Sequence, residues 1–467
     1  MLEPKVWQVT AGSVALGLVC AAVAVAAAGP WDAGQRRAER ERAAAGARAG
    51  GAHHGPAGRG APAPAPSAAG VLSALTTAST APEDVPAGLS GDLGRRLGPL
   101  MDDKGLGATR TASVVDVATG TRLYGKGQDK AMVPASTVKI ATMTAALSAL
   151  GPDHRIATTV TATPDRRRLT LVGGGDATLD AAGLRALADD TARALRERGD
   201  RAVTLAYDTS LYSGPRRHPI GPNDNIAPVV PLMVGQGRAD PSSQGPAPRG
   251  EDPAGDAADA FTGLLRDRGV RVTADPAEGR SPAGAEPLAR TYSRPLAALV
   301  ERALTESDND IAESLARQTA IATGRPASFA GAGRAVGAEL KKLKMPLAGA
   351  RFADGSGLNR ADRASAALLT ALLTRAADPA HPELRPVLTG LPVAGFNGTL
   401  RGRYAHAAPA AGLVRAKTGT LTGVNTLAGT VVDRRGRLLA FAFMAGSTRS
   451  PGAAQDALDR LSAALVR

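Results

Sequence analysis

Short apolar runs bounded by turn residues mark the chain just after residue 110, and a longer apolar run follows them. Residues 113–117 and 121–124 carry valine, leucine and tyrosine and are separated by the turn residues 118–120, so they are predicted to form a β-hairpin. Residues 136–150 are mostly small and apolar and follow Pro134, a pattern and length that favour a helix.

The last fifth of the chain repeats the strand pattern three times and then becomes helical. Strands are predicted over 412–419, 424–432 and 437–445, with a turn at 433–436 and a helix over 453–466. Strands at both ends of a region with helices between them can join one sheet. The pattern therefore predicts an α+β domain whose sheet gathers both of its ends.

The middle of the chain has a different character. Residues 161–290 are rich in turn residues and carry no pattern that continues the flanking elements. We interpret this region as an inserted accessory region of one or more domains. The principal domain is then formed by residues 87–160 and 291–467 together.

The first 86 residues combine two patterns. Residues 9–28 are an uncharged stretch of 20, so 1–30 is interpreted as a signal peptide or a membrane anchor that could act as a tether. Residues 31–86 are mostly Ala, Gly, Pro and Ser, a composition typical of a disordered linker. Four arginines within 36–42 favour a cytoplasmic flank, but large domains are often translocated regardless of such charge. We therefore expect an extracytoplasmic protein of the cell envelope, either membrane-anchored or secreted.

Charge and cysteine content narrow the functional classes. The 467-residue chain has a formal net charge of +13 at pH 7, which favours anionic surroundings such as nucleic acid, acidic lipids or wall polymers. It lacks zinc-finger spacing, an aromatic-rich strand motif and a dense basic helix, so no nucleic-acid partner is expected. The single cysteine, Cys20, excludes an intrachain disulfide.

Three short motifs carry the candidate chemistry. In order they are Ser136-Thr-Val-Lys139, Ser307-Asp-Asn309 and Lys417-Thr-Gly-Thr420. Each is weak alone, because a serine three before a lysine is common, SDN can cap a helix and KTG can end a strand. Their order and their predicted structural setting make the combination specific for an active-site-serine enzyme.

Ser136 and Lys139 are the predicted nucleophile and base. A serine hydroxyl attacks only when a base takes its proton, and residues three apart on a helix share one face. Lysine is a base only when neutral, which requires burial or a nearby positive charge to lower its pKa. Lys417 could supply that charge. Arginine could not replace Lys139, because it does not deprotonate in proteins.

The other motif residues fit the remaining steps of acyl transfer. Ser307 would relay a proton to the leaving amine, and Asn309 would hold both the substrate amide and the lysine. The N–H groups of Ser136 and Thr420 would form the oxyanion hole.

Substrate binding is assigned to the last motif. The strand over 413–420 would align an extended peptide by backbone hydrogen bonds, with Gly419 inside it. Lys417 together with the Thr418 and Thr420 side chains would contact the substrate's terminal carboxylate.

Further stretches resemble one family, the D-alanyl-D-alanine carboxypeptidases/endopeptidases of low-molecular-mass penicillin-binding proteins (DacB-like, peptidase S13). The resemblance covers about 90–467 and includes, besides the three motifs, residues 171–179, 207–215, 354–358, 391–395 and 398–400. It implies a penicillin-binding/serine β-lactamase-like transpeptidase fold with an insertion between the first two motifs. It also implies peptidoglycan peptides ending in D-Ala-D-Ala as substrates, covalent inhibition by β-lactams, and no metal or organic cofactor. Gly235-Gln236 replaces an acidic pair that is usual in the family, so side-chain recognition by that loop is not carried over.

Two other functions stay open at this point. A β-lactamase needs an added base for deacylation, and no Glu-x-x-x-Asn motif occurs at the usual position between Lys139 and Ser307. A non-catalytic sensor would keep the fold and bind β-lactams or cell-wall peptides without turnover. A zinc peptidase is poorly supported, because the six histidines show no metal-ligand spacing.

Overall fold

The structure is a computed structural model, and it describes residues 89–197, 199 and 202–466. The segments interpreted as a signal peptide or anchor (1–30) and as a linker (31–86) lie outside the described residues. All described residues belong to one compact unit. Within that part of the chain, no helix is long and apolar enough to cross a membrane.

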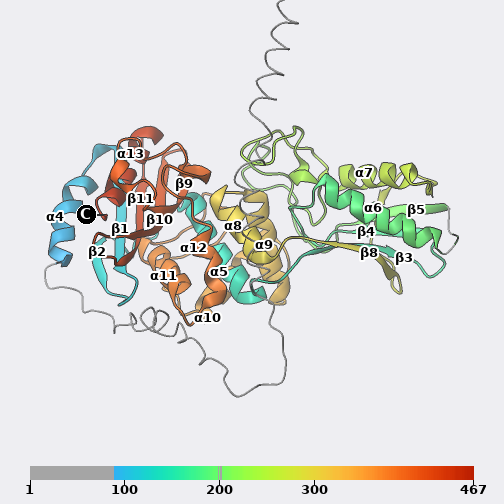
Figure 1. The fold of residues 1–467 in the computed structure, drawn as a ribbon, viewed down its shortest axis with the longest axis horizontal. Coiled ribbons are helices and arrows are strands. Elements are labelled where there is room, and N and C mark those ends of the chain that lie inside the picture. The colour runs from blue at the N-terminus through green and yellow to red at the C-terminus, as the bar shows by residue number, and fades with distance from the viewer. Residues whose placement is uncertain (1–88, 198, 200–201, 467) are drawn as a thin grey trace, which may run out of the picture. The chain divides into compact units, whose positions relative to one another are not determined.

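The first sheet gathers both ends of the principal domain (Figure 1). Its five strands lie in the order β2-β1-β11-β10-β9, and every neighbouring pair is antiparallel. They are β1 (Thr109–Asp116), β2 (Arg122–Lys126), β9 (Arg415–Leu421), β10 (Val424–Val432) and β11 (Leu438–Gly446). The predicted hairpin, the three C-terminal strands and their union in one sheet are confirmed.

Helices cover both faces of this sheet. α4 (Leu89–Met101) and α13 (Pro451–Ala463) pack on one face, and α11 (Ala366–Ala377) packs on the other. Residues of β11 alternate between the two faces, with Phe441 and Phe443 on the α4–α13 side. Each buried phenylalanine contributes about 1.5–3 kcal/mol to stability.

Helix α5 (Lys139–Leu150), which follows the short 3₁₀ turn η2 (Ala135–Val138), lies at the centre of a helical group. Every residue from Lys139 to Leu147 is buried, which explains why the sequence shows an apolar run rather than an amphipathic stripe. Its neighbours are α11 and four further helices: α8 (Leu296–Thr305), α9 (Asn309–Ala322), α10 (Phe329–Lys342) and α12 (Pro386–Thr389). The start of α5 is therefore a rigid support for the first motif.

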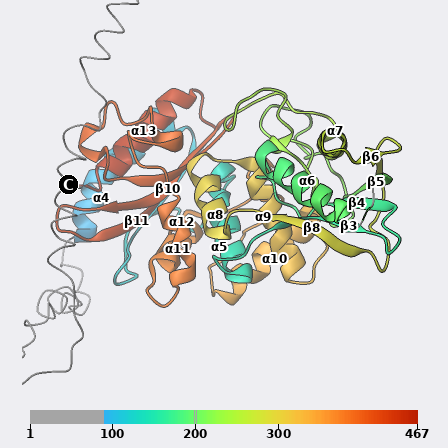
Figure 2. The same cartoon turned by 45° about the vertical axis from the view of Figure 1, so that its right-hand side comes forward.

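A second, six-stranded sheet has the order β6-β5-β4-β3-β8, with β7 paired to β5. Its strands are β3 (Ala157–Ala162), β4 (Arg168–Val172), β5 (Ala202–Asp208), β6 (Arg271–Val272), β7 (Ala277–Glu278) and β8 (Glu286–Tyr292). β4, β5 and β6 are parallel and are connected through α6 (Ala181–Arg196) and α7 (Pro253–Asp267), which lie on one side of the sheet in Figure 2. The sheet thus includes β3 and the end of β8, a few residues beyond 161–290.

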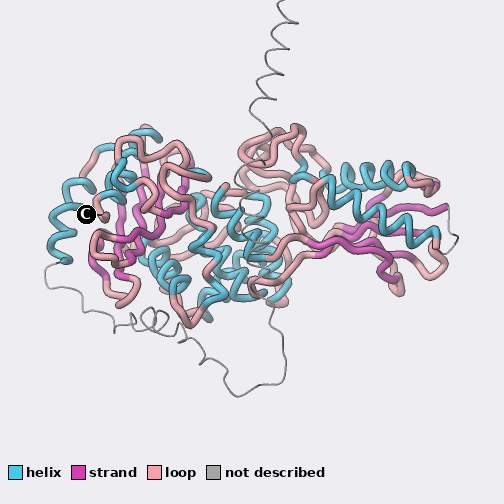
Figure 3. Tube along the Cα trace, in the orientation of Figure 1, coloured by secondary structure: helices cyan, strands magenta, loops and turns pink. Residues whose placement is uncertain are grey.

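The connection from β5 to α7, residues 209–252, is mostly loop (Figure 3). It returns from the second sheet to the start of α9, where its Ala227 N–H donates to Asp310 (2.9 Å). Through this long loop the middle of the chain reaches the residues of the second motif.

Candidate active site

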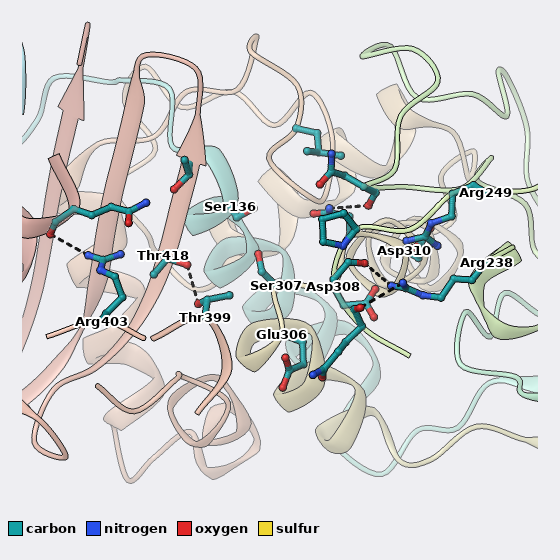
Figure 4. A pocket seen from close by; sticks show the side chains of 18 residues that line it. Ser136, Arg238, Arg249, Glu306, Ser307, Asp308, Asp310, Thr399, Arg403 and Thr418 are labelled. Carbon is teal, nitrogen blue, oxygen red and sulfur yellow. Dashed lines mark hydrogen bonds and ion pairs between the residues drawn. The ribbon is translucent and has the colours of Figure 1, made fainter. Parts of the chain in front are cut away.

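The three motifs meet around one cleft of about 380 Å³. Ser136, Ser307, Thr418 and Thr420 line it, although they come from η2, the loop before α9 and strand β9. Figure 4 shows Ser136 and Ser307 between Thr418 on one side and the loop that carries Arg238 on the other. The fold thereby joins motifs that are far apart in the sequence.

Lys139 is fully buried, and its amine is within hydrogen-bonding distance of Ser136, the predicted nucleophile. Its Nζ is 3.1 Å from Ser136 Oγ, 2.7 Å from Asn309 Oδ1 and 2.6 Å from the carbonyl oxygen of Ser356. A neutral amine has two hydrogens and one lone pair. When the hydrogens are donated to the two carbonyl-type oxygens, the lone pair is left for the Ser136 hydroxyl, as a general base requires.

The environment of Lys139 shifts its protonation equilibrium toward the neutral amine. Burial lowers the pKa of Lys139 to about 8, although four nearby carboxylates act in the opposite direction, those of Asp354, Asp308, Glu313 and Asp310. At pH 7 a group with such a pKa is about one-tenth neutral. The predicted base is thus held close to its working protonation state.

The second motif begins helix α9. Asp308 caps the helix, because its side chain accepts a hydrogen bond from the N–H of Ile311 (3.0 Å). Asn309 comes next and points its Oδ1 at Lys139, while its Nδ2 donates to the carbonyl of Asn225 (2.9 Å). The predicted contact of Asn309 with the lysine is present, and its contact with a substrate amide stays a prediction.

Backbone strain surrounds the cleft. Ala135, Ser307 and Gln236 all have a positive φ, at 47°, 57° and 60°. L-residues other than glycine rarely adopt this conformation, and it persists where surrounding contacts hold it, often at functional sites. Ala135 directly precedes the nucleophile, so its conformation aims Ser136 into the cleft.

The third motif lies on β9, the edge strand of the first sheet. Val393 forms a bridge with Arg415 at its start, so the edge from Lys417 to Leu421 is left unpaired by the strands described. Unpaired strand edges bind extended peptides by strand addition. The Thr418 hydroxyl donates to Thr399 Oγ1 (2.8 Å), which fixes its orientation at the cleft wall.

Gly419 is required by the close approach of β9 to η2. A Cβ at this position would lie 2.2 Å from Thr426 Oγ1 and 2.7 Å from the Pro134 carbonyl. We predict that Gly419→Ala destabilises the protein by about 1–3 kcal/mol and slows acylation, because the strand must move away from the nucleophile. Thermal unfolding and β-lactam acylation rates check this, with Gly402→Ala as the control because nothing lies within 4 Å of a Cβ there. Equal effects of the two substitutions would contradict the packing argument.

Lys417, the lysine of the third motif, lies inside the protein close enough to Lys139 for their charges to interact. It is fully buried, it donates to the Thr418 carbonyl (2.8 Å), and it is not among the residues that line the cleft. Burial lowers its pKa well below the usual value, and the charge of Lys139 lowers it further. Burial is thus the leading cause of the lowered pKa of Lys139, and the contact of Lys417 with a substrate carboxylate stays a prediction.

Sequence reasoning missed several groups at the site. The Ser356 carbonyl belongs to residues 354–358, one of the stretches that resemble the family, and a backbone oxygen leaves no signal in side-chain identity. Arg403 lines the same cleft and is held by a two-pronged ion pair with Asp459. Gln236 is buried and donates to the Asp308 carboxylate (2.6 Å). It occupies the position where an acidic residue was expected, and an amide avoids a repulsive pair of carboxylates there.

One group of described residues has metal-ligand geometry: His218, Glu313 and Asp354, whose ligand atoms lie within 4.8 Å of one another. These atoms already have protein partners. His218 Nε2 and Asp354 Oδ2 are 2.8 Å apart, and Glu313 forms a buried ion pair with Arg317 (3.0 Å). A guanidinium beside the group opposes a second cation, so the chemistry is that of a hydrogen-bond network.

A serine and a lysine one turn apart, an SDN loop and a KTG edge strand on an α+β fold define a class, the active-site-serine penicillin-binding proteins and their β-lactamase relatives. Within this class the chain belongs to the D-Ala-D-Ala carboxypeptidase 3 (S13) family, which it matches over residues 95–251 and 243–465. The family resemblance seen in the sequence is confirmed. The chain is accordingly a serine-type, penicillin-binding D-Ala-D-Ala carboxypeptidase/endopeptidase.

Relatives cover most of the chain. It is 39% identical over 372 residues to carboxypeptidase DacB of Mycolicibacterium smegmatis, and this match covers 76% of this chain and 80% of that protein. It is 30% identical over 470 residues to the D-alanyl-D-alanine carboxypeptidase of Actinomadura sp., covering 82% and 87% of the two chains. The crystal structure of penicillin-binding protein 4 from Haemophilus influenzae has the same fold, with a TM-score of 0.67 at 21% identity over 80% of this chain and 97% of that one.

Proposed function

We propose that Ser136, activated by Lys139, forms an acyl-enzyme with peptidoglycan stem peptides that end in D-Ala-D-Ala. Ser136 Oγ attacks the carbonyl of the penultimate D-Ala while its proton passes to the lone pair of Lys139. The peptide C–N bond breaks, and the terminal D-Ala leaves after its amine takes a proton by way of Ser307. Water then hydrolyses the ester and regenerates Ser136. The observation that carries this proposal is the buried Lys139 amine, 3.1 Å from Ser136 Oγ and fixed by two carbonyl-type oxygens.

Substrate placement follows from the walls of the cleft. The peptide would add to the free edge of β9, and the N–H groups of Ser136 and Thr420 would hold the oxyanion, where one donor is worth about 10²–10³ in rate. The terminal carboxylate would meet the Thr418 and Thr420 hydroxyls. Arg403 lines the same wall with its charge paired to Asp459, and Lys417 stays a candidate contact for that carboxylate.

β-Lactams would acylate Ser136 by the same attack, because the lactam carbonyl takes the place of the peptide carbonyl. A second structure of the Haemophilus influenzae protein, with a TM-score of 0.63 at 22% identity over 80% of this chain and 97% of that chain, is a complex with a β-lactam. The adduct is therefore the most accessible test of the nucleophile.

We place this activity outside the cytoplasm, where peptidoglycan stem peptides are cross-linked. The uncharged run at 9–28 suits export or a membrane tether, and a net charge of +13 suits anionic wall polymers. Fractionation of cells that express the chain tests the location. Full recovery of the intact chain in the cytoplasm would contradict it.

The protonation of Lys139 predicts the pH dependence of acylation. Burial lowers the pKa of Lys139 to about 8, so the neutral base increases as pH rises, and the acylation rate should climb about tenfold per pH unit up to that value and then level off. Burial also raises the pKa of Asp310, which lines the cleft, to about 7. Asp310→Asn removes this second titration, and because the Asp310 carboxylate raises the pKa of Lys139, the step should move below pH 8 in this variant. A rate that falls between pH 6 and pH 8 in both proteins would contradict the role of Lys139.

A further inference from the structure

The carbonyl of Ser356 fixes one of the two hydrogens of the Lys139 amine. The residue is fully buried, and its carbonyl oxygen makes the shortest of the three contacts with Nζ, at 2.6 Å. If this carbonyl turned away, the amine would be free to rotate and its lone pair would no longer point steadily at Ser136 Oγ. The direction of a single peptide group therefore affects the base.

Asp354 sets the direction of that peptide group. The Ser356 carbonyl and the Gly357 N–H belong to the same peptide plane, and this N–H donates to Asp354 Oδ1 (2.7 Å). The plane is thus held by Lys139 at its oxygen and by Asp354 at its nitrogen. The preceding N–H groups, of Gly355 and Ser356, both donate to Glu313 Oε1 at 2.9 Å, which fixes the loop on the side of α9.

The second oxygen of Asp354 accepts from the Ser356 hydroxyl (3.0 Å) and the Asn359 N–H (2.8 Å), which belong to the same loop. Its third partner is His218, a residue of the 209–252 loop. His218 Nδ1 accepts a hydrogen bond from the Ile220 N–H (3.1 Å), so the proton lies on Nε2, which donates to Asp354 Oδ2 (2.8 Å). Neither side chain has exposed surface. The imidazole also packs edge-on against Phe329, with the ring centroids 5.2 Å apart. His218 is therefore locked in one orientation and one tautomer.

The carboxylate that His218 holds is ionised, and its neighbour Asp362 is not. Burial alone would raise the pKa of Asp354, but the hydrogen bonds that it accepts, first of all from His218, outweigh burial and hold that pKa well below its usual range. Burial and the Asp354 charge raise the pKa of Asp362 to about 10, so Asp362 is protonated, and its Oδ1 accepts from the N–H groups of Ala353 (2.6 Å) and Asp354 (3.3 Å). Glu313 and Arg317 complete the charged groups around the cluster and neutralise each other.

We infer that His218 is a positioning residue for catalysis, which directs the Lys139 amine at Ser136 through Asp354 and the Ser356 peptide group. This inference rests on the proposed function. It gives the inserted region a second connection to Lys139, besides the one that runs from the Asn225 carbonyl through Asn309. His218 touches neither substrate nor the reacting atoms. Its loss should therefore slow the chemical step without weakening the binding that precedes it.

The test separates non-covalent binding from acylation by following the acylation rate against the concentration of a chromogenic cephalosporin. His218→Leu should lower the acylation rate constant about 10- to 100-fold, because small misplacements of a catalytic group have costs of this size, and it should leave non-covalent binding unchanged. His218→Gln should recover most of the rate, since its terminal amide can donate to Asp354 from nearly the same place as Nε2. His381→Leu is the matched control, because that histidine pairs with Glu383 and has no contact with the site. Thermal unfolding of each variant reports stability separately.

The outcomes distinguish a role of His218 in positioning the base from a role in the stability of the core alone. A folded His218→Leu variant that acylates at the wild-type rate overturns the inference, and so does a folded His218→Gln variant that is as slow as His218→Leu. If His218→Leu fails to fold, His218→Gln carries the test, with a near wild-type rate supporting the inference and a tenfold loss in the folded protein overturning it. Failure of the proposed function would look different, because the wild-type chain itself would then form no adduct.

Discussion

Replacing the nucleophile, Ser136→Ala, is expected to lower D-Ala release from a D-Ala-D-Ala peptide by about 10⁶-fold, the cost of removing a nucleophilic serine from a hydrolase. The methyl group cannot form the ester, and no other hydroxyl lies within hydrogen-bonding distance of Lys139 Nζ among the described residues. Release of D-Ala measured over time checks this, together with the thermal stability of the variant.

Ser148→Ala is the matched control for that substitution. Ser148 lies on the same helix, α5, and makes only a long contact of 3.4 Å with Glu339, so its variant should keep wild-type activity. A Ser136→Ala protein that still releases D-Ala at a rate near that of the control would show that another residue attacks the peptide.

Lys139→Arg is the second substitution with a large expected effect. It keeps a positive charge but supplies a group that does not deprotonate, so acylation should slow by about 10²- to 10⁴-fold, the range for loss of a general base. The variant should also lose the rise in rate toward pH 8 that the lysine produces. Measuring the acylation rate from pH 6 to pH 10 tests both expectations at once.

The control for this change is Lys126→Arg on β2, where the lysine pairs with Asp102 at the protein surface. There an arginine can make the same ion pair, so rate and pH profile should stay those of the wild type. If Lys139→Arg acylates as fast as this control, Lys139 is not the base.

The sequence was most informative where chemistry requires particular side chains at short spacing. The spacing of Ser136 and Lys139 predicted their contact because both lie within one helical turn. The strands of the first sheet were predicted because their alternation and turn residues are local signals. The strand starts differ by a few residues at most, as for β9, which was predicted from residue 412 and begins at Arg415.

Groups that act through tertiary contacts could not be predicted in this way. The Ser356 carbonyl is 217 positions from Lys139, and Asn225 is 84 positions from Asn309. The burial that lowers the pKa of Lys139 is likewise a property of the packed helices around it. The second sheet escaped prediction because its parallel strands are separated by helices and long loops, so no local turn identifies their partners.

The inserted region is part of the active site rather than a neighbour of it. Its loop provides the Asn225 carbonyl to Asn309 and the Gln236 amide to Asp308, and Arg249 forms a buried ion pair with Asp310 (2.9 Å). These contacts hold the start of α9, from which Asn309 reaches the lysine. Breaking one of them by removing a single partner would leave a buried charge or amide unpaired, which is costly.

The most direct test of the account is the intact mass of the purified chain after exposure to benzylpenicillin, followed by peptide mapping of the product. One penicilloyl group per molecule is expected, located on the peptide that contains Ser136 and absent from Ser136→Ala. An adduct on another residue, or no adduct while the drug remains intact, would contradict the central claim. No lasting adduct with destruction of the drug would instead identify a β-lactamase and contradict the assignment as a peptidase.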